Sequence, residues 1–216
     1  MYPITVVDDF FSEPDKIVDY AMQQEFFPSE NGRWPGKRSK FLWELDRTLY
    51  DDICVKIISL FHPELPERWD FEMQFQLISP YSEHQYDPKN RGWIHVDKGD
   101  TKFGGIIYLN KHPEKDTGTC IYKEKKGWSS QIYKCLEIKQ KHYTGEEVSD
   151  EEYERWMYEL NSQYEETMII KNVYNRMALF NCNTWHGVQT FGKNQDRLTI
   201  SFFCRDLPRL QPPYYR

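Results

Sequence analysis

Two side chains with a strong affinity for metals, His95 and Asp97, flank a single valine in the segment GWIHVDKGD. In an extended chain, residues two positions apart point to the same side, so both groups can reach one point in space. Imidazole and carboxylate ligands together suit a borderline divalent ion such as Fe(II). A strand edge that turns two polar residues toward solvent has the same pattern, so the pair alone leaves both interpretations open.

His186 is the histidine whose setting best fits a third ligand. It lies in NCNTWHGVQTF, between two strand-like runs and beside Trp185. A polar side chain in an apolar setting needs a hydrogen bond or a metal, so a hydrogen-bonded structural histidine is the alternative. The remaining histidines lie in polar or proline-flanked segments, and we expect them at the surface: His62, His84, His112 and His142.

The strand-like run RLTISFF supplies a group that can bind an anion. Alternation places Arg197, Thr199 and Ser201 on one face of this run and apolar residues on the other. A guanidinium inside a barrel needs an anionic partner; its planar fork suits a carboxylate, to which Thr199 can also donate. An edge-strand arginine paired with the neighbouring Asp196 is the ordinary alternative.

Taken jointly, these segments resemble the Fe(II)- and 2-oxoglutarate-dependent oxygenases, and most closely their prolyl-4-hydroxylase-like branch. The similarity covers roughly residues 70 to 204. It rests on HVD at 95–97, GGIIYLNK at 104–111, RMALFN at 176–181, HGVQ at 186–189 and RLTISFF at 197–203.

The resemblance implies a double-stranded β-helix, also called a jelly-roll or cupin-like barrel, that uses Fe(II), 2-oxoglutarate as cosubstrate and O2. It implies hydroxylation of an unactivated C–H bond with release of succinate and CO2, and the carboxylate at Asp97 argues against halogenation. The implied catalytic iron ligands are His95, Asp97 and His186. The implied binding residues for the far carboxylate of 2-oxoglutarate are Arg197, Tyr108 and Thr199, the last standing where the family has serine.

Two other functions use the same residues differently. A cupin-like metal-binding protein or isomerase would keep the metal ligands but would have no need of Arg197 as an anchor for a 2-oxo acid. A structural or interaction domain with a lapsed site would retain no metal. The complete ligand set together with the anchor makes the lapsed site the weakest alternative.

Composition limits the class of protein. A chain of 216 residues fits one domain, residues 1–216, and a 16% aromatic share predicts a sizeable core. The net charge of -6 argues against a nucleic-acid partner, and no apolar run is long enough to span a membrane. Five scattered cysteines and no signal-peptide pattern predict reduced thiols in a cytoplasmic protein. The substrate, a small molecule or a peptide, and the oligomeric state stay open.

The elements that must position these residues follow from periodicity. Residues 1–69 predict an opening strand, a helix from Ser12 with a capping box to Asp15, and a second helix from about Asp46 to Phe61. Residues 70–204 predict the β-barrel, and residues 205–216 a tail. The predicted strands are FEMQFQL, GWIHV, KFGGIIYLN, TGTCIYK, MIIKNVY, RMALFNC, HGVQTF and RLTISFF.

An insertion at about residues 123–166 separates Asp97 from His186. We predict one amphipathic helix in it, at 150–166, with a capping box from Ser149 to Glu152. The insertion is expected either to cover the mouth of the site, as a lid or substrate platform, or to pack on the flank of the barrel. Nearby aromatic residues can line a pocket, although core packing is the commoner role: Trp93, Trp128 and Trp185.

Overall fold

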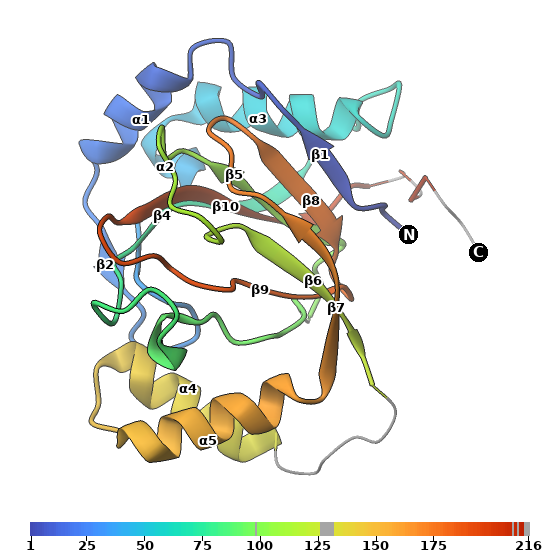
Figure 1. The fold of residues 1–216 in the computed structure, drawn as a ribbon. Coiled ribbons are helices and arrows are strands. Elements are labelled where there is room, and N and C mark those ends of the chain that lie inside the picture. The colour runs from blue at the N-terminus through green and yellow to red at the C-terminus, as the bar shows by residue number, and fades with distance from the viewer. Residues whose placement is uncertain (98, 126–131, 209, 211, 214–216) are drawn as a thin grey trace.

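Two antiparallel β-sheets with flanking helices form the protein in the computed structural model, which describes residues 1–97, 99–125, 132–208, 210 and 212–213 (Figure 1). The larger sheet has seven strands in the order β1-β8-β5-β10-β4-β3-β2, and the smaller has three in the order β7-β6-β9. The architecture is therefore mainly antiparallel β with helices, as predicted.

The strands are β1 Thr5–Val7, β2 Phe27–Pro28, β3 Lys37–Arg38, β4 Asp70–Ile78, β5 Phe103–Tyr108, β6 Thr119–Glu124, β7 Tyr164–Ile170, β8 Met177–Asn181, β9 Trp185–Gly187 and β10 Arg197–Asp206. The helices are α1 Pro14–Met22, α2 Leu42–Leu45, α3 Arg47–Ser59, α4 Ile132–Thr144 and α5 Asp150–Asn161, with a short 3-10 helix at Pro88–Asn90.

Strand β10 divides the interior into two environments. It lies between β4 and β5 in the larger sheet. Its apolar side chains Leu198, Ile200 and Phe202 belong to the main core. Arg197 and Ser201, on the opposite face because side chains alternate along a strand, line a cavity bounded by both sheets. The predicted alternation thus separates the core from the candidate site.

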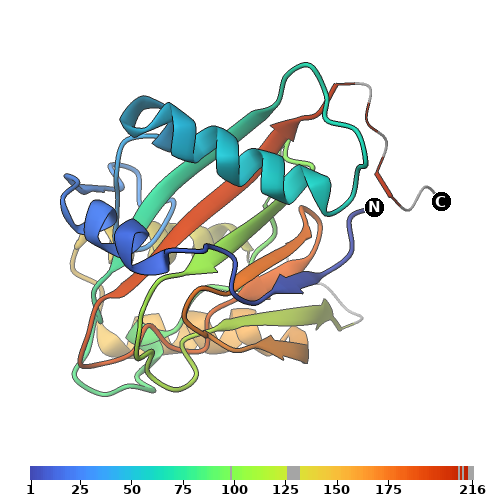
Figure 2. The same ribbon diagram turned by 90° about the horizontal axis from the view of Figure 1, so that it is seen from above.

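Helices α1 and α3 cover the core face of the larger sheet (Figure 2). Helix α3 begins where Asp46 accepts a hydrogen bond from the Leu49 amide at 2.9 Å, as predicted, and buries Ile53 and Ile57. Helix α1 starts later than predicted, at Pro14, and has no side-chain cap, so the capping box from Ser12 is wrong. The proline occupies the first turn, where its missing N–H leaves no hydrogen bond unmade.

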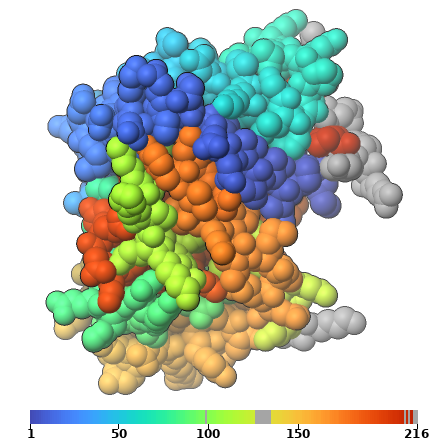
Figure 3. Space-filling view, turned by 45° about the horizontal axis from the view of Figure 1, so that its top comes forward, coloured from blue at the N-terminus to red at the C-terminus, as the bar shows by residue number. Residues whose placement is uncertain are grey.

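The inserted segment contains two helices rather than the one predicted. Helix α4 escaped prediction because its buried residues, Cys135, Ile138 and Tyr143, alternate with charged ones and form only a narrow apolar stripe. Helix α5 is capped by Ser149, whose hydroxyl accepts from the Glu152 amide at 3.2 Å. It ends at Asn161, so the predicted extension to 166 is wrong. The N-terminal helices and the inserted helices lie at opposite ends of the face in Figure 3.

Three predicted strands differ from the structure. The segment GWIHV makes only an isolated bridge, between His95 and His186, because β9 is three residues long and pairs with β6 as well. The strand predicted at 168–174 is β7, which begins earlier, at Tyr164. The strand predicted at 186–191 is reduced to β9, which ends at Gly187. The remaining predicted strands are present with shifted ends.

Two of the four histidines expected at the surface are not exposed. His62 is buried, and its ring lies 3.4 Å from the hydroxyl of Tyr2. His142 packs between the rings of Tyr81 and Tyr153, and its Nε2 lies 3.1 Å from the Lys89 carbonyl. Both follow from helix ends that turn toward the interior. His84 and His112 are exposed, as predicted.

All five cysteines are free thiols, as predicted. Four of them are buried, and Cys182 is half-buried. Among the described residues, none of the helices combines the length and the apolar character needed to cross a membrane.

Candidate active site

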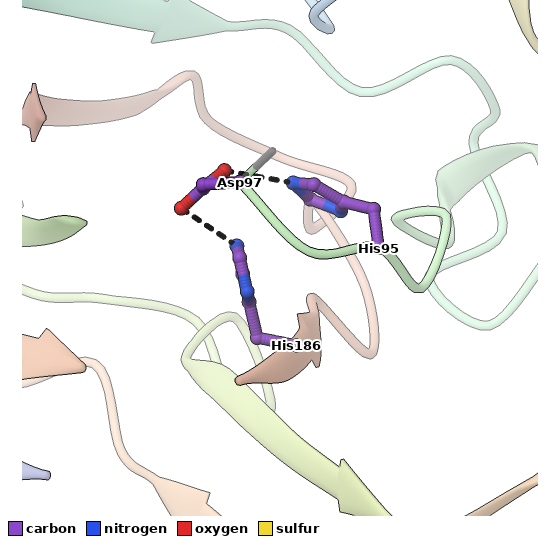
Figure 4. Close-up of side chains that lie close together, drawn as sticks. All are labelled: His95, Asp97 and His186. Atoms are coloured by element: carbon purple, nitrogen blue, oxygen red, sulfur yellow. Dashed lines mark ion pairs between the residues drawn. The ribbon is translucent and has the colours of Figure 1, made fainter. Parts of the chain in front are cut away.

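His95, Asp97 and His186 come together in one cluster, as predicted (Figure 4). The Asp97 carboxylate lies between the two rings, 3.8 Å from His95 Nε2 and 3.7 Å from His186 Nε2. One ligand atom from each residue falls within 4.8 Å of the others. Two imidazole nitrogens and one carboxylate oxygen at this spacing can bind a single divalent metal and leave further coordination positions open.

Backbone carbonyls set the orientation of both imidazoles. His95 Nδ1 donates to the Trp93 carbonyl at 2.8 Å, and His186 Nδ1 donates to the Thr184 carbonyl at 2.9 Å. Because a carbonyl only accepts, each bond places the proton on Nδ1 and leaves the Nε2 lone pair free toward Asp97. Both rings are therefore held in the tautomer that a metal ligand needs.

The electrostatic setting keeps His95 neutral. Burial lowers its pKa well below the ordinary value, and the nearby His186, Lys139 and Arg38 lower it further. Although 45% of the His95 side chain is accessible, His95 lines the cavity. A neutral imidazole is the form that binds a metal.

A cavity of about 670 Å³ joins the triad to Arg197. Strands from both sheets line it, and the inserted helices complete the wall with Cys135, Lys139, Tyr143 and Leu160. The insertion thus lines the candidate site. Trp93 and Trp185 also line the cavity, whereas Trp128 lies outside the described residues.

Arg197 is buried at the far side of this cavity, only 3% exposed. Its Nε donates to the Thr117 carbonyl at 2.8 Å, and its Nη2 has no hydrogen-bond partner among the described residues. Within the described parts of the chain it forms no ion pair, so the predicted alternative of a pair with Asp196 is wrong. An unpaired buried guanidinium nitrogen is costly, and a carboxylate ligand would satisfy it.

Two hydroxyls on the same face of β10 as Arg197 also have unused hydrogen-bonding capacity. Thr199 Oγ1 and Ser201 Oγ are buried, and neither has a hydrogen-bond partner in the part of the chain that the structure describes. Tyr108 is fully buried, its ring lies 5.5 Å below the Arg197 guanidinium, and its hydroxyl shares a 2.7 Å hydrogen bond with Thr119 Oγ1. Ser201 lines the cavity together with Arg197, whereas Thr199 and Tyr108 are not part of its lining. A guanidinium nitrogen and hydroxyls with unused hydrogen-bonding capacity suit a carboxylate.

Sequence reasoning assigned no role to several residues of the cavity. Ser201 was placed on the correct face of its strand, and alternation from Arg197 is the signal that points to it. Arg38 lies on the short strand β3, in a segment whose sequence resembles a loop. Lys139 lies on helix α4, which was not predicted. No local sequence pattern links either residue to the triad.

Comparison with solved structures shows the same fold in 2-oxoglutarate-dependent oxygenases. A prolyl-4-hydroxylase from Pseudomonas putida superposes with a TM-score of 0.53 at 13% identity over 95% of this chain and 93% of its own. A prolyl hydroxylase from Trichoplax adhaerens gives 0.56 at 11% identity, over 97% and 89% of the two chains. HygX from Streptomyces hygroscopicus, solved with nickel and 2-oxoglutarate, gives 0.55 at 12% identity, over 99% and 86%.

No curated protein sequence matches the chain. A protein-family model matches residues 1–203, which is nearly the whole chain. The chain therefore belongs to the family described as a family of unknown function, DUF6445, and shares its fold with the 2-oxoglutarate-dependent oxygenases.

Proposed function

We propose that the protein is an Fe(II)- and 2-oxoglutarate-dependent oxygenase that hydroxylates a C–H bond of its substrate within a single jelly-roll domain. One observation carries this proposal: the His95, Asp97 and His186 cluster opens into the same cavity as the unpaired Nη2 of buried Arg197. A metal site alone would not need a buried cation in the same cavity. A site in which the metal binds one end of a dicarboxylate needs such a cation, because the cation pairs with the other carboxylate.

Each group then has a role at a stated atom. The Nε2 atoms of His95 and His186 and a carboxylate oxygen of Asp97 would hold Fe(II). Arg197 Nη2, with the hydroxyls of Thr199 and Ser201, would bind the far carboxylate of 2-oxoglutarate, and Tyr108 would support the guanidinium from below. Iron and 2-oxoglutarate, when bound, supply the oxidising chemistry with O2, releasing succinate and CO2.

The inserted helices form one wall of the proposed reaction site. Helices α4 and α5 close one side, and aromatic residues such as Trp93 and Trp185 line the space beside the triad. Walls that shield a site from solvent strengthen the interactions of charged groups inside it and protect reactive species. This supports the interpretation of the insertion as a substrate platform.

The test is spectroscopic and needs no knowledge of the substrate. Purified protein is mixed with Fe(II) and 2-oxoglutarate without oxygen, and the metal-to-ligand charge-transfer band is recorded during titration with 2-oxoglutarate. We expect a saturable band in the wild type, none in His95→Ala, and at least about tenfold weaker 2-oxoglutarate binding in Arg197→Ala. Arg47→Ala is the matched control, because Arg47 is exposed on helix α3 and pairs with Asp51 outside the cavity lining, and it should behave as the wild type.

The outcome separates the candidate functions. Absence of the band in folded, metal-loaded protein would refute the oxygenase. Metal binding without affinity for 2-oxoglutarate would instead support the cupin-like metal protein or isomerase. Loss of metal binding altogether would support a lapsed site.

A further inference from the structure

Two cations that the proposed cofactor sites do not use face the triad. Arg38, from β3, and Lys139, from helix α4, line the same cavity as His95 and Asp97. Arg38 Nε is buried and has no hydrogen-bond partner within the described segments. Across the described ranges, neither side chain forms a salt bridge, although both experience the charge of Asp97.

Aromatic rings hold both groups in place. The Arg38 guanidinium lies 4.6 Å from the Trp34 ring centroid and 5.7 Å from that of Phe203. Lys139 Nζ lies 5.9 Å from the Tyr143 ring centroid. Burial lowers the pKa of Arg38 to about 10 and that of Lys139 to about 8, so both remain mostly cationic at neutral pH yet are poorly solvated. An anion between them would relieve that desolvation.

The charges of the cavity balance without these two residues. Arg205 is paired with Glu72 at 2.7 Å, and Arg33 is exposed. A divalent metal with the Asp97 carboxylate leaves one positive charge, and Arg197 adds a second. The two negative charges of 2-oxoglutarate neutralise both. Arg38 and Lys139 are then the cations left without a counter-charge.

The size and lining of the cavity limit what can supply that counter-charge. A volume of about 670 Å³ suits a small molecule. The walls of the cavity include Trp34, which lies against Arg38, and also Trp93 and Trp185, and these rings favour an apolar body. A ligand that satisfies both observations has an apolar part and a compact oxyanion.

We propose that the substrate is a small anionic molecule whose carboxylate or phosphate group binds between Arg38 and Lys139, so that its apolar part faces the metal triad. This inference rests on the proposed oxygenase function, because the charge balance assumes bound metal and 2-oxoglutarate. It goes further by stating the substrate class and the residues that select it.

Binding of simple probes tests the inference directly. Benzoate, phenyl phosphate and neutral benzyl alcohol are titrated by calorimetry into protein loaded with Mn(II) and 2-oxoglutarate, without oxygen. We expect saturable binding of at least one anionic probe and at least about tenfold weaker binding of the alcohol. Preference between the two anions distinguishes a carboxylate substrate from a phosphate substrate.

Matched variants locate the binding site. Arg38→Gln and Lys139→Gln should each weaken binding of the anionic probe at least about tenfold, and Arg38→Lys should weaken this binding less. The controls are Lys37→Gln, one residue away on β3 and exposed, and Lys141→Gln, on helix α4 and paired with Glu137. Both controls remove one positive charge outside the cavity lining and should leave probe affinity within about twofold, since screened surface charges act weakly at a distance.

Three results would overturn the inference: equal binding of benzyl alcohol and the anions, no saturable anion binding, or unchanged affinity in Arg38→Gln and Lys139→Gln. If these variants instead lose metal or 2-oxoglutarate binding while anion affinity stays, the two cations serve Asp97 rather than a substrate. The charge-transfer titration measures the proposed function separately. If that titration fails, anion binding to the unloaded protein still tests the Arg38 and Lys139 site.

Discussion

The backbone amides of His95 and His186 each donate a hydrogen bond to the carbonyl of the other residue, with both N–O distances 2.9 Å. Their ring centroids lie 4.3 Å apart. This single bridge joins segments that are far apart in the sequence and sets the spacing of the two imidazoles through the backbone. The Asp97 amide adds a 3.1 Å hydrogen bond to the Cys182 carbonyl, so all three ligands are positioned by main-chain contacts between the same two segments.

Gly104 leaves room for the Asp97 carboxylate because it has no side chain. A Cβ at Gly104 would lie 2.9 Å from Asp97 Oδ2 and 3.2 Å from Phe203 Cδ1. Gly104→Ala should therefore fold but push the carboxylate out of place, with metal affinity reduced about tenfold or more, as for other residues that orient ligands. Titration of Mn(II) by electron paramagnetic resonance measures this.

Gly187→Ala is the control for that experiment. It stands next to His186, but its Cβ would meet no atom nearer than 3.4 Å, so metal affinity should be kept. Equal metal affinity in Gly104→Ala and the wild type would show that Asp97 has room to move and that the close approach has no role in metal binding.

The unpaired hydroxyls of Thr199 and Ser201 predict opposite effects on stability and on binding. Thr199→Val and Ser201→Ala remove buried polar groups that have no partner, so the unliganded protein should keep its free energy of unfolding or gain about 1 kcal/mol. Both variants should bind 2-oxoglutarate more weakly, by roughly tenfold each. Urea denaturation and the charge-transfer titration measure the two effects.

A hydroxyl that already has a partner provides the contrast. Thr167 Oγ1 donates to the Ile121 carbonyl at 3.1 Å, so Thr167→Val should lose about 1 kcal/mol of stability and no 2-oxoglutarate affinity. Destabilisation of Thr199→Val and Ser201→Ala by the same amount, with unchanged binding, would remove these hydroxyls from the cosubstrate site.

Helix α5 offers a matched pair of tyrosines that measures how firmly the insertion is attached. Tyr153 is 1% exposed and packs edge-on against Trp93, with ring centroids 5.7 Å apart, whereas Tyr158 is 74% exposed. Tyr153→Ala should lower the free energy of unfolding by about 3 kcal/mol, as aromatic truncations in cores do. Tyr158→Ala should change it by less than about 0.5 kcal/mol. Similar values for the two variants would mean that the insertion contributes little to global stability.

His142 predicts a loss of stability in mild acid. Burial lowers its pKa from 6.5 to about 4, so between these values the unfolded chain binds a proton that the folded chain excludes. Stability from this group is therefore present above about pH 6.5 and falls as the pH drops toward 4, by up to about 3 kcal/mol. Urea denaturation at pH 7.5 and at pH 5 measures the change.

Substituting the ring isolates this contribution. His142→Phe keeps an aromatic ring among Tyr81 and Tyr153 but cannot be protonated, so its stability should depend less on pH over this range. His112→Phe, at an exposed position, should retain the wild-type dependence. If the slopes of His142→Phe and the wild type coincide, other groups cause the acid sensitivity.

The sequence alone determined the parts of the molecule that depend on local period and spacing. Alternation along RLTISFF separated Leu198 and Ile200 from Arg197, and the structure places them on opposite faces of β10. His95 and Asp97, two positions apart, predicted a shared metal site once His186 and Arg197 were taken with them. The apolar stripe after Asp46 and the capping box at Ser149 predicted two helix starts. These features depend only on residues that are close together in the sequence, so local sequence patterns are enough to predict them.

Tertiary structure decided everything that depends on contact between distant segments. The His95–His186 bridge, rather than a predicted strand, aligns the ligands, and helix α4 brings Lys139 to the cavity from a segment without a clear apolar stripe. Burial of His62 and His142 likewise depends on how helix ends pack, which their polar neighbours conceal. A side chain's partners across the fold determine whether its charge is solvated, paired or left for a ligand, and no local pattern records those partners.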